Sequence, residues 1–452
     1  MRKFFSPDST ALSAGSIAPL PQTARITIID SLRGIALLGI LLMNIPFFGM
    51  SHHLAENLNI RNEVSGPNYY TWWIVNTFFE GTMRGLFSIL FGAGTVLLLH
   101  RLEKNRAETN PADIYYRRLI WLLIFGVINA FIFLWPGDIL YSYAICGLFL
   151  FPFRNMKAKH LLLISLAFLI FFTIRGTLQW NEMKEIRVNG EKAIALEKKK
   201  VKLTEEQSED KGKWMGMQER LKVESVRKEV AKENKKMHQG YFDVMRYLKD
   251  INVKIQSMMF YNFYFFDIMV FLFLGMALFK WGILTGERSS RFYLLLMLGG
   301  YILGLSLAYW FNRNLVRVQF NPTLIYDRMY INLYQVKRIF ITLGHIGLVM
   351  LLYKYHLADR LLKWLSRVGQ MAFSNYLMQS LICVFIFYGF GLRWYGYMQR
   401  YELYFVVLGI WIFQIIFSNV WLSYFKFGPF EWLWRSLTYW QRQSFKKRTA
   451  II

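Results

Sequence analysis

The chain has 452 residues, of which 55% are hydrophobic, 18% aromatic and only 18% charged. In soluble proteins roughly a quarter of all residues are charged, so this composition excludes an ordinary water-soluble domain. The net charge of +25 could suggest a nucleic-acid partner. However, the lysines and arginines lie mostly in short loops between apolar runs, as they do in membrane proteins. No finger, helix-turn-helix or aromatic-basic pattern accompanies them, so no nucleic-acid partner is expected.

Apolar runs near 20 residues long recur along the sequence, and about 20 helical residues cross a bilayer core. Because the backbone inside lipid must satisfy its own hydrogen bonds, each run is expected to be an α-helix. The sequence therefore predicts an all-α integral membrane protein with about ten transmembrane helices. The expected spans are 28–50, 72–99, 117–136, 138–153, 160–176, 257–281, 291–311, 331–353, 370–391 and 402–424. The fourth span is short and could pair with the third as a tight hairpin.

A charged insert, 178–256, separates the fifth and sixth spans; it lacks proline and is dense in Glu and Lys. Opposite charges at i,i+4 spacing predict a solvated helical hairpin outside the membrane. Its apolar residues are too sparse for a globular core. We interpret the insert as a spacer or as a docking arm for a partner or a second copy; a part in substrate handling is the alternative.

The insert divides the chain into five segments. They are a flexible cytoplasmic N-terminus (1–24), an N-terminal transmembrane bundle (25–177), the insert (178–256), a C-terminal transmembrane bundle (257–425) and a basic aromatic cytoplasmic tail (426–452). The first 24 residues contain no compact apolar stretch with a cleavage site, so no removable signal peptide is predicted.

Alternate loops are rich in Lys and Arg, and the positive-inside rule therefore predicts that both termini are cytoplasmic. The insert then faces outward. One loop departs from the rule: Arg313, Arg317 and Arg328 lie in segment 312–330, which this topology places outside.

Cys146 and Cys383 both lie inside apolar runs, where they are interpreted as small buried hydrophobic residues. No His, Cys, Asp or Glu cluster has the spacing of metal ligands, so no metal is expected.

The first span contains several polar residues. Asp30 and Arg33 are three apart and can pair on one helix face. Arg33 and Asn44 are eleven apart, which places them on one face about 16 Å from each other along the axis. His52 and His53 follow at the outer mouth, and histidine exchanges protons readily near neutral pH. Plainer readings stay open: an interfacial anchor for the charged pair, a helix–helix hydrogen bond for Asn44, and solvated histidines.

Polar groups inside a membrane are costly and point to function or helix pairing. In the second span Glu80 and Arg84 are i,i+4 and expected to pair, and Asp138 begins a later helix, where it could be an N-terminal cap. Arg338 is the strongest signal, because an arginine that deep needs an anion or a carboxylate nearby. The other polar residues inside apolar runs are Asp267, His345, Asn375, Gln379 and Gln414. Together they imply a polar interior or cavity.

Glycines recur in the second span and would allow close helix contact. They are Gly81, Gly85, Gly92 and Gly94.

Five ordered segments resemble the bacterial YeiB family of integral membrane proteins, which is defined largely by a C-terminal domain of unknown function. The segments are RITIIDSLRGIALLGILLMNIPFFG, MRGLFSILFGAG, GDILYSYAICG, GQMAFSNYLMQSLI and FGPFEWLWRSLTYW. The resemblance covers nearly the whole chain except residues 1–24 and the insert.

The first span is also similar to that of heparan-α-glucosaminide N-acetyltransferase, which moves acetyl groups from cytosolic acetyl-CoA to a sugar amine across the membrane. In that enzyme an Asp-x-x-Arg-Gly motif and an asparagine precede a catalytic histidine at the non-cytosolic mouth. The matching positions are Asp30, Arg33, Gly34 and Asn44, with His52 or His53 near the histidine. In surface-polysaccharide O-acyltransferases an Arg and a His are eleven apart, and here Asn44 stands in place of that histidine.

This resemblance implies a transmembrane acyltransferase of the bacterial inner membrane. Its co-substrate would be acyl-CoA, most simply acetyl-CoA, and its acceptor an envelope glycan or lipid. The arginines expected to hold the co-substrate are Arg33, Arg84, Arg117, Arg118, Arg338 and Arg435. His52 or His53 would deprotonate the acceptor, while Asn44 would orient it or stabilise the oxyanion.

Two other classes of function stay open. A transporter or lipid-handling protein would use the same polar residues to line a pathway. A scaffold for envelope assembly would act through the insert. Near the C-terminus, Glu431 and Arg435 share a helix face, and this aromatic segment is expected to anchor at the membrane interface or to contact a cytoplasmic ligand.

Overall fold

The computed structural model describes residues 26–104 and 110–447. Within these ranges every regular element is a helix, apart from one isolated bridge between Phe425 and Lys446. The prediction of an all-α membrane protein is therefore confirmed. The flexible segment predicted at 1–24 lies outside the described residues.

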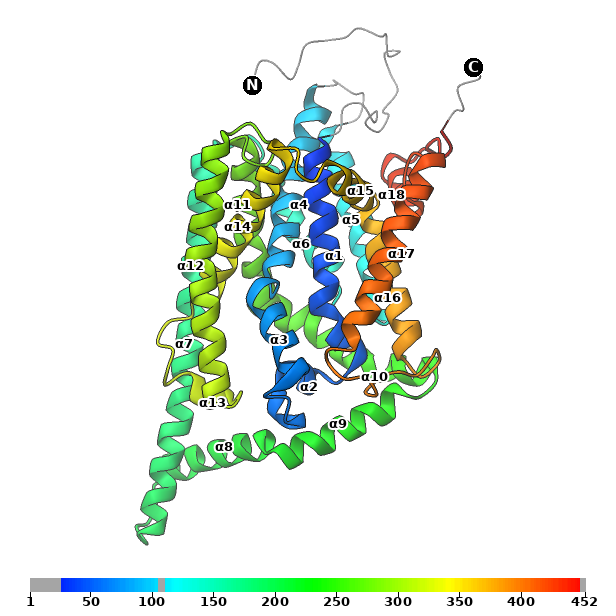
Figure 1. Ribbon diagram of the computed structural model, residues 1–452. Helices are drawn as coiled ribbons and strands as arrows, with labels where there is room; N and C mark the ends of the chain where they lie inside the picture. Colours follow the sequence, from blue (N-terminus) through cyan, green and yellow to red (C-terminus); the bar gives the residue numbers. More distant parts are fainter. Residues whose placement is uncertain (1–25, 105–109, 448–452) are drawn as a thin grey trace, which may run out of the picture.

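In the part of the chain that the structure describes, eight helical stretches are long and apolar enough to cross a membrane (Figure 1). They are α1 (Thr27–Gly49), α3 with α4 (Gly66–Phe78 and Thr82–Lys104), α5 (Pro111–Phe131), α7 (Ala158–Lys198), α10 with α11 (Tyr241–Lys254 and Phe265–Lys280), α12 (Ser290–Arg317), α14 (Tyr334–Lys354) and α17 (Leu403–Tyr424). A ninth crossing is possible in α15 (Asp359–Gln370) and α16 (Ala372–Phe387), which are bent by 79° at their junction.

The expected count of ten spans is therefore too high, because the fourth does not cross. Its helix, α6 (Leu140–Leu148), has nine residues, or about 14 Å at the helical rise, whereas a bilayer core is about 30 Å thick. α6 packs against α5 as the short arm of a hairpin. After α6, the rest of this apolar run forms a single turn of 3-10 helix, Phe151–Phe153.

The two ends of the bundle differ in what they carry (Figure 1). The start of α1 and the last helix, α18 (Pro429–Tyr439), lie at one end, which we call the terminal end. The short helix α2 (His52–Glu56), together with α8 (Glu205–Leu221) and α9 (Val223–Met237), lies at the opposite end, which we call the insert end.

The charged insert is helical, but only half of it is a free hairpin. α7 is one unbroken helix of 41 residues that continues beyond its apolar part into the insert. α8 folds back along it, with Trp214 buried against Gly190. α9 then crosses the insert end of the bundle, and α10 leads back into it (Figure 1). Apolar residues on one face of these two helices join the main hydrophobic core: Val226, Val230, Met237, Val244 and Leu248. The expectation of a wholly solvated hairpin was wrong for this half.

Helices from the two predicted bundles are interleaved, since α1 packs along α15 and α4 along α11. The α4–α11 contact depends on small residues. A Cβ atom on Gly92 would lie 2.1 Å from the carbonyl oxygen of Leu272, and one on Gly275 would lie 2.0 Å from that of Ile89. The two backbones therefore touch. Gly94, two residues further along, would meet nothing within 4 Å.

Replacing Gly92 by alanine is expected to destabilise the protein by about 1–3 kcal/mol, because two backbones must separate to admit the methyl group. Gly94→Ala is the matched control in the same helix; it should be neutral or slightly stabilising, since alanine favours helix more than glycine. Thermal unfolding of both variants in detergent measures the difference. Equal melting temperatures for the two would contradict the close α4–α11 contact.

Candidate functional site

A buried ionic cluster joins three membrane helices near the middle of the molecule. Asp267 on α11 is 3% exposed and accepts hydrogen bonds from Arg84 Nη2 on α4 (2.6 Å) and from Gln335 Nε2 on α14 (2.7 Å). Arg338, also on α14, donates to the same carboxylate and to Gln335 Oε1. The anion that sequence reasoning required near Arg338 is therefore Asp267.

The cluster extends to the break between α3 and α4. There Gly81 adopts a left-handed φ of +69°, and its carbonyl oxygen accepts two bonds from Arg338, at 3.0 and 2.9 Å. The preceding residue, Glu80, accepts from Lys337 Nζ (2.7 Å) and from the Tyr334 hydroxyl (2.6 Å). Glu80 thus pairs with Lys337 rather than with Arg84, as its spacing had suggested, because the helix is interrupted between them.

The charges of this cluster do not balance. Arg84, Lys337 and Arg338 face two carboxylates, Asp267 and Glu80, which leaves an excess of one positive charge. The side chain of Arg338 is only 1% exposed, whereas that of Arg84 is 31% exposed. Its Nε is buried without a hydrogen-bond partner among the described residues. Arg84 is therefore the member of the cluster that an additional anion could reach.

A second basic group lies at the terminal end. Arg33 pairs with Asp30 (2.7 Å). Arg118 on α5 stacks on Trp434 of α18, with its guanidinium carbon 4.0 Å from the ring centre. The positive charges of Arg33 and Arg435 both act on Arg118, for which the described chain offers no carboxylate at ion-pair distance. Three arginines expected to hold a co-substrate are thus gathered here.

Arg117 lies beside this group, over the ring of Trp440 at 4.9 Å. The nearby Glu431 contacts the start of α16. Its carboxylate accepts from the backbone nitrogens of Phe373 and Ser374, at 2.7 and 3.0 Å. These are unpaired donors at the start of α16, so Glu431 caps that helix. Through this contact the C-terminal segment fixes the bend between α15 and α16.

The insert end carries a third polar group, built around a residue of the insert. Glu233 on α9 accepts from Ser51 Oγ (2.5 Å) and from the Tyr395 hydroxyl (2.6 Å). His52 lies beside it, with Nδ1 3.6 Å from the carboxylate, and its ring is 55% exposed. His53 stacks on His52 with ring centres 3.9 Å apart. The predicted catalytic histidines therefore meet the insert.

This arrangement shifts the pKa values of His52 and His53 in opposite directions. The Glu233 carboxylate raises the pKa of His52 above 6.5, and partial burial opposes the effect only in part. Burial, followed by the positive charge of His52, lowers the pKa of His53. Burial alone would raise the pKa of Glu233, but the bonds from His52, Ser51 and Tyr395 hold it below its usual value. His52 is therefore the stronger base of the two histidines.

Most other polar residues predicted within the spans form hydrogen bonds inside the protein. Asp138 accepts from Asn129 Nδ2 (2.8 Å) and from the backbone nitrogen of Tyr141, as a helix cap does. His345 bonds the Phe78 carbonyl and the Tyr301 hydroxyl, both at 2.9 Å. These contacts are structural.

The polar residues of α16 and α17 bond one another. Asn375 donates to Ser418 (2.9 Å), and Gln379 donates to Gln414 (3.0 Å). Asn44 is different. It is half-buried on α1, and the described residues give its side chain no hydrogen bond. Its amide is therefore available to a ligand.

Sequence reasoning missed Glu233, Ser51, Tyr395, Gln335 and Lys337 as members of these groups. Glu233 was one acidic residue among many in the insert, and only the docking of α9 brings it to His52. Lys337 did carry a signal, since it directly precedes Arg338 in an apolar segment. Among the described residues no group of three His, Cys, Asp or Glu side chains could hold a metal ion.

The fold and these groups define an all-helical membrane protein with an ionic cluster in its interior and polar groups at both ends. Residues 278–441 match the family described as "Protein of unknown function (DUF418)". The uncharacterised protein YxaH of Bacillus subtilis is 29% identical over 96% of this chain and all of its own length. The uncharacterised protein YeiB of Escherichia coli is 26% identical over 91% of this chain and 95% of its own.

An uncharacterised 39.9 kDa protein of Bacillus acidopullulyticus, described by its position in the amylase 3′ region, is 27% identical over 93% of this chain and 96% of its own. The resemblance to the YeiB family is confirmed: the chain carries a DUF418 domain and is homologous to YxaH and YeiB. No solved structure matches it significantly.

Replacing Asp267 by asparagine is expected to destabilise the protein by about 3–5 kcal/mol, because the buried Arg338 and the partly exposed Arg84 lose their shared counter-charge. Asp243→Asn is the control; that carboxylate pairs with Arg246 on the surface at 3.1 Å, and such pairs contribute about 0–1 kcal/mol. Thermal unfolding of the purified variants measures both effects. An Asp267→Asn protein as stable as the control would contradict the role of this cluster.

Replacing Glu233 by glutamine is expected to lower the pKa of His52. In the intact protein this pKa is raised, so the charged contact between α2 and α9 exists at low pH and is lost as the pH rises through the raised pKa. NMR titration of labelled histidines measures the shift, with His52→Asn to assign the signal. Glu229→Gln, one turn earlier on α9, should leave His52 nearly unchanged. A pKa that does not move in Glu233→Gln would rule out the contact.

Proposed function

We propose that this protein is a transmembrane acyltransferase of the bacterial cytoplasmic membrane, which moves an acyl group from cytoplasmic acyl-CoA to an envelope glycan or lipid. The terminal end faces the cytoplasm, because short loops there are rich in positive charge. They include Arg154, Lys157, Lys280, Arg288, Lys354 and Arg360. The insert end and its histidines then face the acceptor.

The cytoplasmic ligand contact is the basic group formed by Arg33, Arg118 and Arg435. Acyl-CoA carries phosphates and an adenine ring, and guanidinium groups bind phosphates in a bidentate manner. Trp434, already stacked against Arg118, offers an aromatic surface beside them. Arg84 and Arg338, by contrast, are engaged by Asp267, so in this proposal Arg338 holds the bundle together and does not bind the co-substrate.

The observation that carries the proposal is the pair of His52 and Glu233 at the opposite end of α1. An imidazole held by a carboxylate can act as a general base. His52 accepts the proton of the acceptor hydroxyl or amine while the oxygen or nitrogen attacks the thioester carbonyl. The C–S bond breaks, the CoA thiolate takes the proton from His52, and the acyl group remains on the acceptor.

Asn44 lies on α1 between the two ends, a little more than one helical turn before the helix ends at Gly49. Its unpaired amide is suited to hydrogen-bond the acyl carbonyl and orient it. The α1 helix spans 23 residues, which corresponds to about 35 Å. The acyl arm of bound acyl-CoA must therefore extend along this helix from the basic group toward the histidines, past Asn44, so that its thioester carbonyl meets the acceptor beside His52.

One observation favours a second candidate, a transporter. The span formed by α3 and α4 is interrupted at Glu80 and Gly81 inside the molecule, and transporters build ion and substrate sites at such breaks. Here the freed carbonyl of Gly81 is bonded by Arg338 and the Glu80 carboxylate by Lys337. A transported anion would compete for those cations.

Acetyl-CoA is expected to raise the melting temperature of the detergent-purified protein, because a ligand that binds only the folded state stabilises it. Arg118→Gln should lose most of the shift, since it removes a phosphate-binding charge. His52→Ala should keep the shift but lose acyl transfer. His356→Ala, which removes an exposed histidine at the terminal end paired with Asp359, is the control and should retain both.

If the His52→Ala variant retained acyl transfer, His52 could not be the general base. No shift with acetyl-CoA or longer acyl-CoAs, in protein shown to be folded, would favour the transporter. In that case transport of small anions should be tested with Glu80→Gln and Lys337→Gln.

A further inference from the structure

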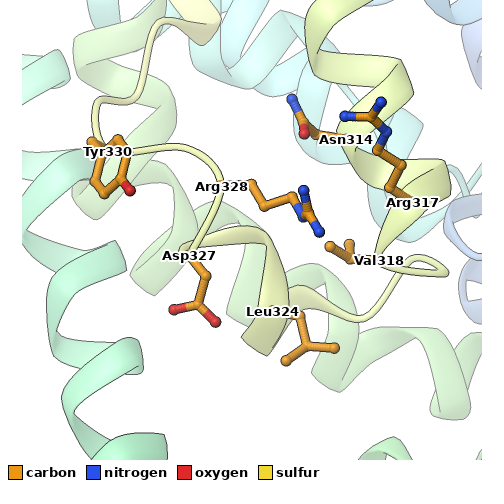
Figure 2. Close-up of a pocket in the computed structure, with 7 residues that line it drawn as sticks. All are labelled: Asn314, Arg317, Val318, Leu324, Asp327, Arg328 and Tyr330. Atoms are coloured by element: carbon orange, nitrogen blue, oxygen red, sulfur yellow. The ribbon is translucent and has the colours of Figure 1, made fainter.

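A pocket at the insert end lies away from the histidines. It carries positive charge that belongs to none of the three polar groups. It has a volume of about 470 Å³ and is formed where α12 ends and α13 (Pro322–Ile325) begins (Figure 2). The lining residues are Asn314, Arg317, Val318, Leu324, Asp327, Arg328 and Tyr330. Its size falls within the range of small-molecule sites.

Both arginines of the pocket lack a partner. In the described chain no carboxylate lies at ion-pair distance from Arg317 or Arg328. The one acidic residue of the lining, Asp327, is already bound by Arg187 Nη2 (2.5 Å) and approached by Lys184 Nζ (3.6 Å) from α7. Figure 2 shows Arg328 reaching toward the end of α12 while Asp327 points away from it. The pocket therefore presents positive charge without compensation.

The backbone around the pocket is held in a strained form. Gln319 and Phe320 follow one another with positive φ values of 51° and 57°, which costs energy in residues other than glycine. Contacts with the segment after α2 and with α3 maintain this turn: Asn59 donates to the Gln319 carbonyl, and Trp72 packs edge-on against Phe320 at 5.1 Å. The turn is thus fixed before any ligand binds.

The position of these arginines also departs from the positive-inside rule. With the terminal end in the cytoplasm, the loop that carries Arg317 and Arg328 lies on the opposite side, where short loops are normally poor in positive charge. Next to the pocket, Tyr309, Trp310 and Tyr330 are exposed, as aromatic residues are at a membrane interface. The pocket therefore opens where phosphate groups of lipids are found.

We propose that this pocket binds a phosphate-bearing ligand at the outer surface of the membrane, with Arg317 and Arg328 contacting the phosphate oxygens. Leu324, Val318 and Tyr330 provide an apolar wall for the part of the ligand attached to the phosphate. The two sources of such a group are the headgroup of an anionic lipid and a soluble phosphate ester. The site does not depend on acyl transfer, because none of its residues contributes to that step.

The full-length protein in detergent tests this with short-chain phosphatidylglycerol as the probe, and with short-chain phosphatidylcholine, glycerol phosphate and inorganic phosphate as comparisons. The double variant Arg317→Gln/Arg328→Gln should bind phosphatidylglycerol at least about tenfold more weakly than the wild type, since it loses two charge-assisted contacts. The matched control is Arg220→Gln/Arg246→Gln, which removes two exposed insert arginines outside the pocket and should bind as the wild type does.

Binding of phosphatidylglycerol alone would identify a lipid headgroup as the ligand, and equal binding of glycerol phosphate would identify a soluble ester. Should the glutamine variant fail to fold, Arg317→Lys/Arg328→Lys provides the same comparison, because it keeps the charge but loses bidentate contacts. Equal affinity of the pocket and control variants for phosphatidylglycerol would overturn the proposal. Equal binding of phosphatidylcholine, which also carries a phosphate, would support contacts to the phosphate oxygens rather than to the rest of the headgroup. Loss of acyl transfer without loss of phosphatidylglycerol binding would concern only the proposed enzyme.

Discussion

The carboxylate of Asp267 is the single group on which the rest of the bundle depends. It is shared by Arg84 and Arg338, and so it ties α11 to α4 and α14. Because Arg338 also bonds the Gly81 carbonyl, the same interaction stabilises the break between α3 and α4. Two close backbone contacts at Gly92 and Gly275 keep α4 and α11 near enough for it to form.

The functional groups lie at the two ends of this rigid centre. At the terminal end, α18 brings Arg435 and Trp434 to Arg118 while Glu431 caps α16. At the insert end, α9 brings Glu233 to His52. The insert is therefore part of the candidate site and not a detachable arm. A deletion of the insert would impair the protein whether it is a scaffold or an enzyme. Such a deletion would therefore not distinguish these two functions.

Hydropathy and charge alone predicted the membrane class, most of the spans and the need of Arg338 for a carboxylate. They could not identify Asp267 as that carboxylate, because the two residues are 71 positions apart and several acidic groups were equally available. The apolar run of 138–153 was taken for a span because hydropathy does not register where a helix stops. The break at Gly81 was not predicted, because Glu80 and Arg84 on either side of it have the i,i+4 spacing of a pair on one continuous helix. Glu233 could be found only after α9 was seen to dock.

In the proposed mechanism one ligand links the basic group at the terminal end to the histidines at the insert end. Electron cryomicroscopy of the protein with a non-hydrolysable thioether analogue of acyl-CoA tests this most directly. The account predicts density for the nucleotide at Arg33, Arg118 and Arg435, with the acyl arm directed along α1 toward Asn44. Density for the nucleotide elsewhere, or an arm that leaves α1 and enters lipid, would contradict it.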